Sequence, residues 1–292
     1  MAVSPDGKIL VSAGDGRNEA VGDRALKLWD PVTGKELDAL ESDGIFSATF
    51  SPDGRTLVTG DRYANVTLWD VKTREKVAVM GGHTSWVWSV AFSPDGKTVA
   101  SSSGDGTAKL WHIASELEPN LPQGHAHRWT WDEHEQGRGI LSLSPDGQTL
   151  AVAAAEHAVT FWDTATGKVR ATLKGHTAPV NALAFSPDGN FVATAGETGI
   201  RLWDAAAAQE QATLAESGRF TCVAFSPDSK KLAAATNLAT IIVWDLLTGK
   251  RQAALKSDSS WITSVAFSPD GGTLATGSLA WTLPTKRENG KV

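Results

Sequence analysis

The sequence has little of what marks several common classes of protein. A single cysteine, Cys222, excludes an internal disulfide framework and a cysteine-based metal cluster. No apolar run approaches the roughly 18 residues that a membrane-spanning helix needs. The N-terminal residues have neither the basic segment nor the apolar core of a signal peptide, so a cytoplasmic location is expected. The net charge of -6 argues against a surface dedicated to nucleic acid.

Tryptophan, by contrast, is abundant, with 12 residues beside a single tyrosine in a chain of 292. Hydrophobic residues make up 41% and charged residues 21%, which is typical of a globular protein and excludes disorder. The chain is organised by a repeated tetrapeptide, Ser-Pro-Asp-Gly, which reads Ser-Pro-Asp-Ser in its sixth copy. Its serines are Ser4, Ser51, Ser93, Ser144, Ser186, Ser226 and Ser268. A period in this range decides the fold and must be interpreted before any local feature.

Each copy of the tetrapeptide predicts a tight turn between two strands. Proline presets φ for the second position of such a turn, and Asp and Gly suit the positions that follow. Short β-rich segments flank the turn, as at Val90–Phe92 and Thr98–Ala100. A third predicted strand ends in Trp-Asp in five copies and in Trp111-His112 in one. The six tryptophans of this position are Trp29, Trp69, Trp111, Trp162, Trp203 and Trp244.

Thr-Gly-Lys follows three of these strands and leads to a fourth strand, and Gly-His then closes three of the units. A unit of four strands that runs from Gly-His to Trp-Asp resembles a blade of the WD-repeat (WD40-type) β-propeller family. The near-identical Ser-Pro-Asp-Gly copies resemble bacterial members of that family. The resemblance implies an all-β fold, a seven-bladed propeller with four-stranded antiparallel blades. The expected blades of this single domain, residues 1–292, are 1–40, 41–80, 81–121, 122–173, 174–214, 215–255 and 256–292.

The two ends of the chain depart from the repeat, so the first and last blades are expected to be incomplete. Met1–Val3 supplies too little of a first strand, and Lys286 stands where the seventh tryptophan is expected. Propellers of this family close by pairing strands from both termini. Two explanations remain open: the chain is a fragment with altered ends, or the seam is completed by a missing segment or a second copy.

One blade holds all the residue types with which the family ties a blade together. The resemblance implies a structural tetrad of His83, Ser101, Asp105 and Trp111. A His-Ser-Asp set could also suggest a hydrolase, but the implied order of Trp, Ser, His and Asp favours a structural role, because buried polar groups must satisfy one another. No catalytic residue is expected here.

Two insertions interrupt the repeat, within 14–24 and within 127–139. Chain direction alternates along a blade, so both are expected on the face opposite the Ser-Pro-Asp-Gly turns. Aromatic and arginine side chains gather at the same loops, and these residue types dominate interface hot spots. They are the candidate partner-binding residues Phe46, Trp86, Trp88, Arg128, Trp129, Trp131, Arg219 and Trp261. The alternative is that Trp86 and Trp88 pack beneath the 127–139 loop.

Other chemistry has little support in the sequence. His125, His127, Asp132 and Glu133 could suggest a metal site, but a solvated charged loop explains them more simply. Cys222 occupies a small-residue position of a strand and is expected to be buried. Phosphate-binding loops, dinucleotide fingerprints and nucleophile elbows are absent, so no cofactor and no metal are expected.

The sequence therefore predicts a non-catalytic scaffold that binds a protein or peptide on the face of the two insertions, with no nucleic-acid or membrane partner. The alternative is that this chain is a fragment of a larger protein and serves as its regulatory or sensor domain. A kinase-linked protein is one such case.

Overall fold

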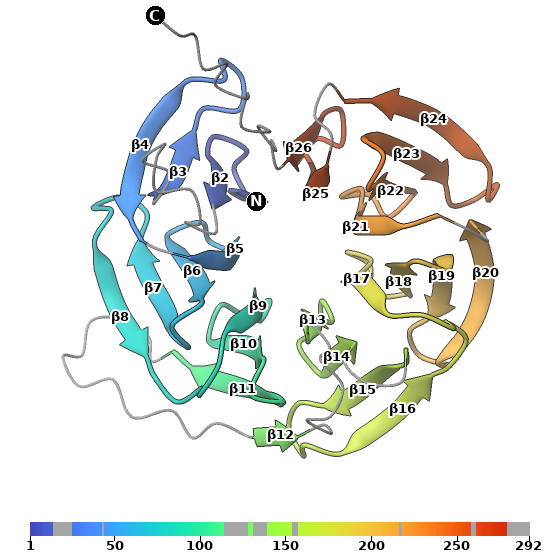
Figure 1. The fold of residues 1–292 in the computed structure, drawn as a ribbon, viewed down its shortest axis with the longest axis horizontal. Helices are drawn as coiled ribbons and strands as arrows, with labels where there is room; N and C mark the ends of the chain where they lie inside the picture. Colours follow the sequence, from blue (N-terminus) through green and yellow to red (C-terminus); the bar gives the residue numbers. More distant parts are fainter. Residues whose placement is uncertain are drawn as a thin grey trace, which may run out of the picture.

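The computed structural model describes residues 1–13, 25–42, 44–113, 128–130, 139–153, 157–215, 218–257 and 261–278. Of residues 25, 41, 128–130 and 215 it describes the backbone alone. All regular elements in these ranges are β-strands, which form small sheets arranged in a ring (Figure 1).

Six of the sheets have four antiparallel strands in sequence order, and we number them blades one to six. Their strands are Ala2–Val3, Leu10–Ala13, Ala25–Trp29 and Glu36–Glu41 (β1 to β4); Ile45–Phe50, Thr56–Asp61, Val66–Asp70 and Lys76–Met80 (β5 to β8); Val87–Phe92, Thr98–Ser103, Thr107–His112 and Arg128–Thr130 (β9 to β12); Ile140–Leu143, Thr149–Ala153, Val159–Asp163 and Val169–Leu173 (β13 to β16); Val180–Phe185, Phe191–Gly196, Gly199–Asp204 and Gln209–Ala215 (β17 to β20); and Phe220–Phe225, Lys231–Thr236, Thr240–Asp245 and Arg251–Lys256 (β21 to β24). A two-stranded sheet, Ile262–Phe267 and Leu274–Ser278 (β25 and β26), lies between blades six and one.

The expectation of a seven-bladed propeller with incomplete first and last blades is therefore corrected to six four-stranded blades and one two-stranded sheet among the described residues. Blade one, expected to be incomplete, has four strands, although β1 contributes only the pairs Ala2↔Val11 and Val3↔Leu10. The count of seven came from the turns, and each sheet has one such turn. A turn between the first two strands says nothing about whether a third and a fourth strand pair beyond them.

The Ser-Pro-Asp-Gly turn is held by the same hydrogen bonds in each sheet, as blade two illustrates. Ser51 Oγ donates to Asp53 Oδ1 (2.6 Å) and accepts from Thr56 N (2.9 Å), while Gly54 N donates to Ser51 O (2.9 Å). Gly54 has φ +71°, which an L side chain rarely adopts. In the sixth copy Ser229 takes this conformation with φ +59°.

Neighbouring turns also touch one another around the ring. The turn glycine of one sheet lies against the turn proline of the sheet before it, as Gly54 does against Pro5. The same contact joins Gly7 to Pro269, across the seam between blade one and the two-stranded sheet. On the face of the turns, the ring is therefore continuous.

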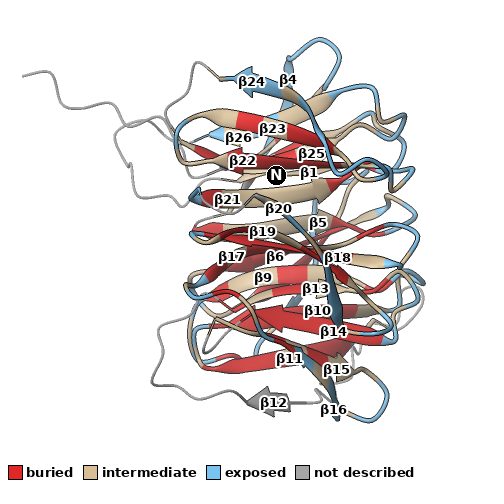
Figure 2. Ribbon diagram, turned by 90° about the vertical axis from the view of Figure 1, so that its right-hand side faces the viewer, coloured by how far each residue is buried: buried red, intermediate tan, exposed pale blue. Residues whose placement is uncertain are grey.

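The hydrophobic core lies between sheets rather than within them. Trp69 of blade two packs against Val11, Leu26 and Leu28 of blade one, and Trp111 packs against Val58 and its neighbours in blade two. The remaining boundaries as far as blade six repeat this arrangement with Trp162, Trp203 and Trp244. Figure 2 shows the result as a stack of sheets that are buried inside and exposed at their turns and outer strands.

Blade three departs from the predicted boundary at residue 121. Its outer strand, β12, pairs Lys109 with Arg128 and Thr107 with Thr130. The prediction counted His125 as the end of the fourth strand, but backbone pairing places the fourth strand after it. Of the residues between β11 and β13, the structure thus assigns 128–130 to the outer strand of blade three.

Candidate interaction surface

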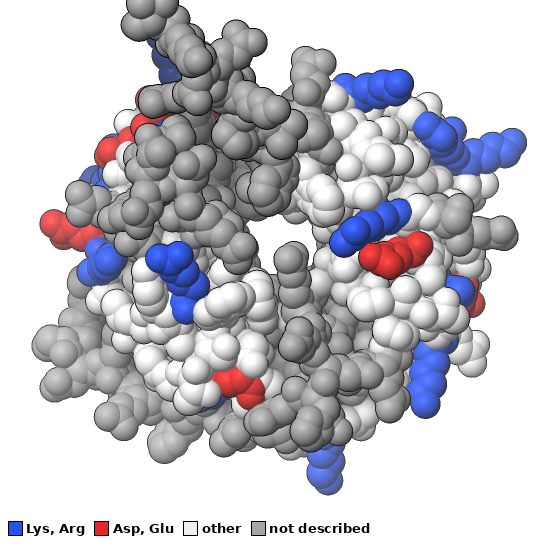
Figure 3. Space-filling view, viewed as in Figure 1, with Lys and Arg blue, Asp and Glu red and all other residues white. Residues whose placement is uncertain are grey.

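The candidate surface lies on the face where the second strand of a blade connects to the third and the fourth connects to the next blade. We call it the loop face, and the opposite one the turn face. Figure 3 shows one side of the ring, and most of the charged side chains that the structure describes there lie toward the outer rim. The predicted insertion 14–24 lies outside the described residues. The predicted insertion 127–139 is divided, since 128–130 form β12.

Three of the predicted residues, Phe46, Trp86 and Trp88, pack together on blades two and three. We call them the aromatic cluster. The ring centroids of Phe46 and Trp88 are 4.8 Å apart, those of Trp86 and Trp88 are 5.3 Å apart, and those of Phe46 and Trp86 are 5.7 Å apart. Trp86 remains 43% exposed, whereas Phe46 and Trp88 are partly buried beneath it. The cluster thus presents one indole on a packed aromatic base.

Two further residues beside Phe46 in blade two were missed by the sequence prediction. Tyr63, in the connection from β6 to β7, is 55% exposed, and its hydroxyl accepts a hydrogen bond from Arg62 Nη2 (2.7 Å). The Arg62 guanidinium lies 5.0 Å from the Tyr63 ring centroid. The signal was present, because Tyr63 stands where Asp105 stands in blade three. This departure from the repeat marks the gain of an exposed aromatic ring.

Arg219 and Trp261 form a second, separate pair on blade six and the two-stranded sheet. The Arg219 guanidinium lies 5.4 Å from the Trp261 ring, and its Nε lies 3.3 Å from Glu197 Oε1. This arginine is therefore engaged with both an aromatic ring and a carboxylate. Arg128 and Trp129 lie on β12, where the structure describes only their backbone, and Trp131 lies outside the described residues.

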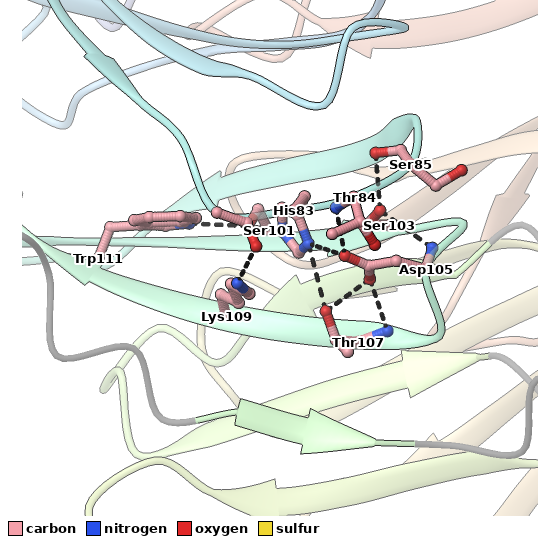
Figure 4. A network of polar contacts seen from close by, with 10 residues as sticks. His83, Thr84, Ser85, Ser101, Ser103, Asp105, Thr107, Lys109 and Trp111 are labelled. Carbon is pink, nitrogen blue, oxygen red and sulfur yellow. Dashed lines mark hydrogen bonds and ion pairs between the residues drawn. The ribbon is translucent and has the colours of Figure 1, made fainter.

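The tetrad residues of blade three form one chain of hydrogen bonds (Figure 4). Trp111 Nε1 donates to Ser101 Oγ (2.8 Å), Ser101 Oγ lies 2.7 Å from His83 Nε2, and His83 Nδ1 lies 3.0 Å from Asp105 Oδ2. Thr107 Oγ1 also donates to Asp105 Oδ1 (2.6 Å). In the tautomer with the proton on Nδ1, His83 donates a hydrogen bond to Asp105, and its Nε2 accepts a hydrogen bond from the Ser101 hydroxyl.

Burial and hydrogen bonding make the tetrad a structural unit. Burial alone would raise the pKa of Asp105, but hydrogen bonds from His83, Thr107 and the Thr84 backbone hold that pKa well below its usual range. Ser101 is fully buried and its oxygen already serves both Trp111 and His83. A nucleophile must reach a substrate, so this serine is in the wrong place for catalysis.

Blade five has a related network that the sequence prediction did not identify. His176 Nε2 lies 2.7 Å from Thr194 Oγ1, Trp203 Nε1 donates to the same oxygen (2.8 Å), and His176 Nδ1 lies 2.9 Å from Thr198 Oγ1. A threonine thus stands in the role of Asp105. Burial, with the nearby Arg201 charge, lowers the pKa of His176 to about 4, so the ring is neutral at neutral pH.

The remaining candidate chemistry is of little consequence in the described residues. Burial raises the pKa of Cys222 to about 11, so this thiol is a poor nucleophile. His125, His127, Asp132 and Glu133 lie outside the described residues, and no group of three metal-binding side chains occurs within them. Across the same described part of the chain, no helix has the length and apolarity to cross a membrane.

Tryptophan and buried histidine side chains hold these sheets together, and the units differ mainly in their loops. This combination defines a WD-type β-propeller. The WD domain, G-beta repeat family matches residues 34–70, 74–112, 126–163, 167–204, 209–245 and 249–283, and the chain belongs to this family. The matched unit at 126 begins two residues before β12, just as the units at 74 and 167 begin two residues before β8 and β16. The family repeat and the strand pairing therefore agree on the fourth strand of blade three.

Several curated proteins resemble the chain. Autophagy-related protein 16 of Arabidopsis thaliana is 26% identical over 275 residues, which cover 87% of this chain and 50% of that protein. Periodic tryptophan protein 2 of Arabidopsis thaliana is 28% identical over 241 residues, covering 77% and 25%. The APC/C activator protein CDC20 of Saccharomyces cerevisiae is 29% identical over 185 residues, covering 60% and 28%.

The chain spans half or less of the length of these three relatives. None of these three names is that of an enzyme, which is in keeping with the generally non-enzymatic nature of this family. All three are eukaryotic and give no support to the bacterial style inferred from the turns.

Proposed function

We propose that this propeller is a non-catalytic scaffold that binds a protein or peptide on its loop face, over blades two and three. The observation that carries the proposal is the aromatic cluster, in which Trp86 is held on Phe46 and Trp88 and yet remains 43% exposed. A large aromatic side chain fixed by its neighbours loses little conformational entropy when a partner covers it, and this is typical of interface hot spots.

The exposed Tyr63 and its Arg62 neighbour extend this surface. They add a hydroxyl and a guanidinium to the loop face of blade two, which suits the polar rim of an interface. Arg219 and Trp261 belong to the proposal as a secondary contact, because the ion pair with Glu197 leaves Arg219 less available. Arg128, Trp129 and Trp131 remain candidates on the strength of the sequence.

The proposal also treats the ring as seven-bladed, with β25 and β26 as the inner half of the seventh blade. The contact of Gly7 with Pro269 supports this, because it repeats across the seam the turn contact found between complete blades. The outer half would then come from chain outside the described residues or from a second copy. A cytoplasmic location is kept as part of the proposal and is testable by cell fractionation.

The experiment compares two single variants of the full chain as bait in affinity capture. Trp86→Ala removes the exposed indole of the loop face, and Leu247→Ala removes a side chain that is 93% exposed on the turn face. We expect Trp86→Ala to lose partners that both the wild type and Leu247→Ala retain, with similar unfolding midpoints for all three proteins. Full retention of every partner by Trp86→Ala would contradict the proposed site.

The sequence left open a regulatory or sensor role within a larger protein, a kinase-linked one included. The relatives do not favour it, since none of the three names given above is that of an enzyme.

A further inference from the structure

A pocket of about 330 Å³ opens on the turn face between blades three and four. Its walls come from two neighbouring Ser-Pro-Asp-Gly turns and from strands β11 and β13. We call it the blade 3–4 pocket, and its defining residues are Pro94, Asp95, Leu110, His112, Leu143 and Asp146. This volume lies at the lower end of the range of roughly 300–1,000 Å³ for ligand pockets, which suits one long side chain.

The chain departs from its own repeat at this pocket. His112 stands where the five other units have the aspartate of Trp-Asp. That aspartate holds the following turn, as Asp70 Oδ1 does by accepting from Thr73 N (2.6 Å). His112 instead lies with Nδ1 3.3 Å from Thr98 Oγ1. In a repeat protein, such local departures mark the places where function is added.

The two carboxylates of the pocket are held in their charged form. The hydrogen bond from Ser93 lowers the pKa of Asp95, and the hydrogen bond from Ser144 lowers that of Asp146. In each case, the hydroxyl and a backbone N–H bind Oδ1, and no hydrogen bond from the described residues reaches Oδ2 of Asp95 or Asp146. Lys97 and Arg170 lie near these carboxylates but do not line the pocket.

We propose that the blade 3–4 pocket binds an arginine side chain of a protein partner, at a site on the opposite face from the aromatic cluster. Two carboxylates from two separate turns match the several N–H donors of one planar guanidinium. Leu110, Leu143 and Pro94 provide an apolar wall for the aliphatic part of the side chain, and the exposed His112 ring offers a flat surface beside it. The geometry thus joins charge complementarity to a cavity of the right size.

The test titrates the full chain with the capped peptide acetyl-Gly-Arg-Gly-amide and follows the His112 ring signals by NMR. The matched control peptide has citrulline, which keeps the shape of arginine and removes its charge. We expect saturable shifts of the His112 signals with the arginine peptide and none with the citrulline peptide. Equal responses to the two peptides, or shifts that do not saturate, would overturn the proposal.

Three variants locate the binding. Asp146→Asn should weaken it about tenfold, the combined effect of a lost ion pair and a lost charged hydrogen bond at a partly exposed site. Asp228→Asn makes the same change in the equivalent turn of blade six, where Ser226 donates to Asp228 (2.6 Å), and should leave binding unchanged. Ala165→Trp fills the pocket from an exposed lining position and breaks no hydrogen bond of the turns, so it should abolish binding. Unchanged affinity in Ala165→Trp, or equal losses in the two Asn variants, would refute the site.

Discussion

Ser101 illustrates how single residues hold this propeller together. Its hydroxyl is the shared partner of Trp111 and His83, and all three side chains are buried. The same strand position carries Ser12, Thr59 and Thr194 in three other blades. In each case the side-chain hydroxyl accepts a hydrogen bond from the indole N–H of the tryptophan in the same blade. The tryptophan thus contributes apolar area between blades and a hydrogen bond within its own blade.

This arrangement predicts different effects for the same substitution in two blades. Ser101→Ala leaves two buried groups, Trp111 Nε1 and His83 Nε2, without their partner, so we expect a loss of about 2–4 kcal/mol in the free energy of unfolding. Ser12→Ala removes the partner of Trp29 Nε1 alone and should cost about 1 kcal/mol. Urea denaturation measures both values, and equal losses would contradict the tetrad as a connected network.

The buried His176 predicts a pH dependence of stability. Its pKa is about 4 in the folded protein against an ordinary value of 6.5, so the unfolded chain binds more protons between these values. Stability contributed by the neutral ring should therefore fall as the pH drops from 6.5 toward 4. We expect His176→Gln to show a flatter dependence of the urea midpoint over this range than the wild type. The exposed His112→Gln variant is the control and should keep the wild-type slope.

At the residue scale, the sequence identified most of the residues that recur from unit to unit and fewer of the residues that differ between units. The turn serines and the core tryptophans could be assigned because each position recurs in register. Tyr63 and Thr198 could not be interpreted in this way, because a departure from a repeat shows that a role is lost without showing what replaces it. Only the contacts of Tyr63 with Arg62, and of Thr198 with His176, define their new roles.

At the scale of the strands, β12 is the element that the sequence misplaced. Gly124-His125 matches the end of a unit by spacing, but β12 lies beyond it and pairs Lys109 with Arg128. A short outer strand has few side chains to pack, so its register depends on backbone hydrogen bonds that no local pattern specifies.

This register is testable by disulfide formation. In a Cys222→Ala background, Lys109→Cys with Arg128→Cys should form a cross-link under mild oxidation, because facing residues of antiparallel strands lie about 4.5–5.5 Å apart. The spacing from His125 would instead place Leu121 opposite Lys109, so Lys109→Cys with Leu121→Cys is the matched control. Cross-linking of the control pair in preference to the first pair would show that the sequence-based register is right.

For the whole molecule, the seam is where the interactions between sheets are fewest in the described residues. Tryptophan-centred clusters fill the boundaries from blade one to blade six, but Trp29 belongs to none of the described clusters. The contact of Gly7 with Pro269 closes the turn face, and Met1 lies against Gly277. None of the described core clusters joins β25 and β26 to blade one.

Hydrogen exchange should therefore be fastest next to the seam. We expect amides of β2, β25 and β26 to exchange before those of β17 to β19, because local opening is easiest where few buried apolar contacts must be broken. The measurement is exchange of the isolated full chain followed by mass spectrometry of its peptides. Uniform protection around the ring would show that the seam is as stable as the complete boundaries.

The sequence by itself determined the family, the strand–turn–strand unit and the residues that build the core, because these are local patterns repeated around the ring. The tertiary structure alone decided which segment pairs as the fourth strand of blade three. It also decided that Phe46, Trp86 and Trp88 share one cluster, while Arg219 and Trp261 form another. Such contacts join different blades, and periodicity along one chain carries no information on how loops of neighbouring blades meet in space.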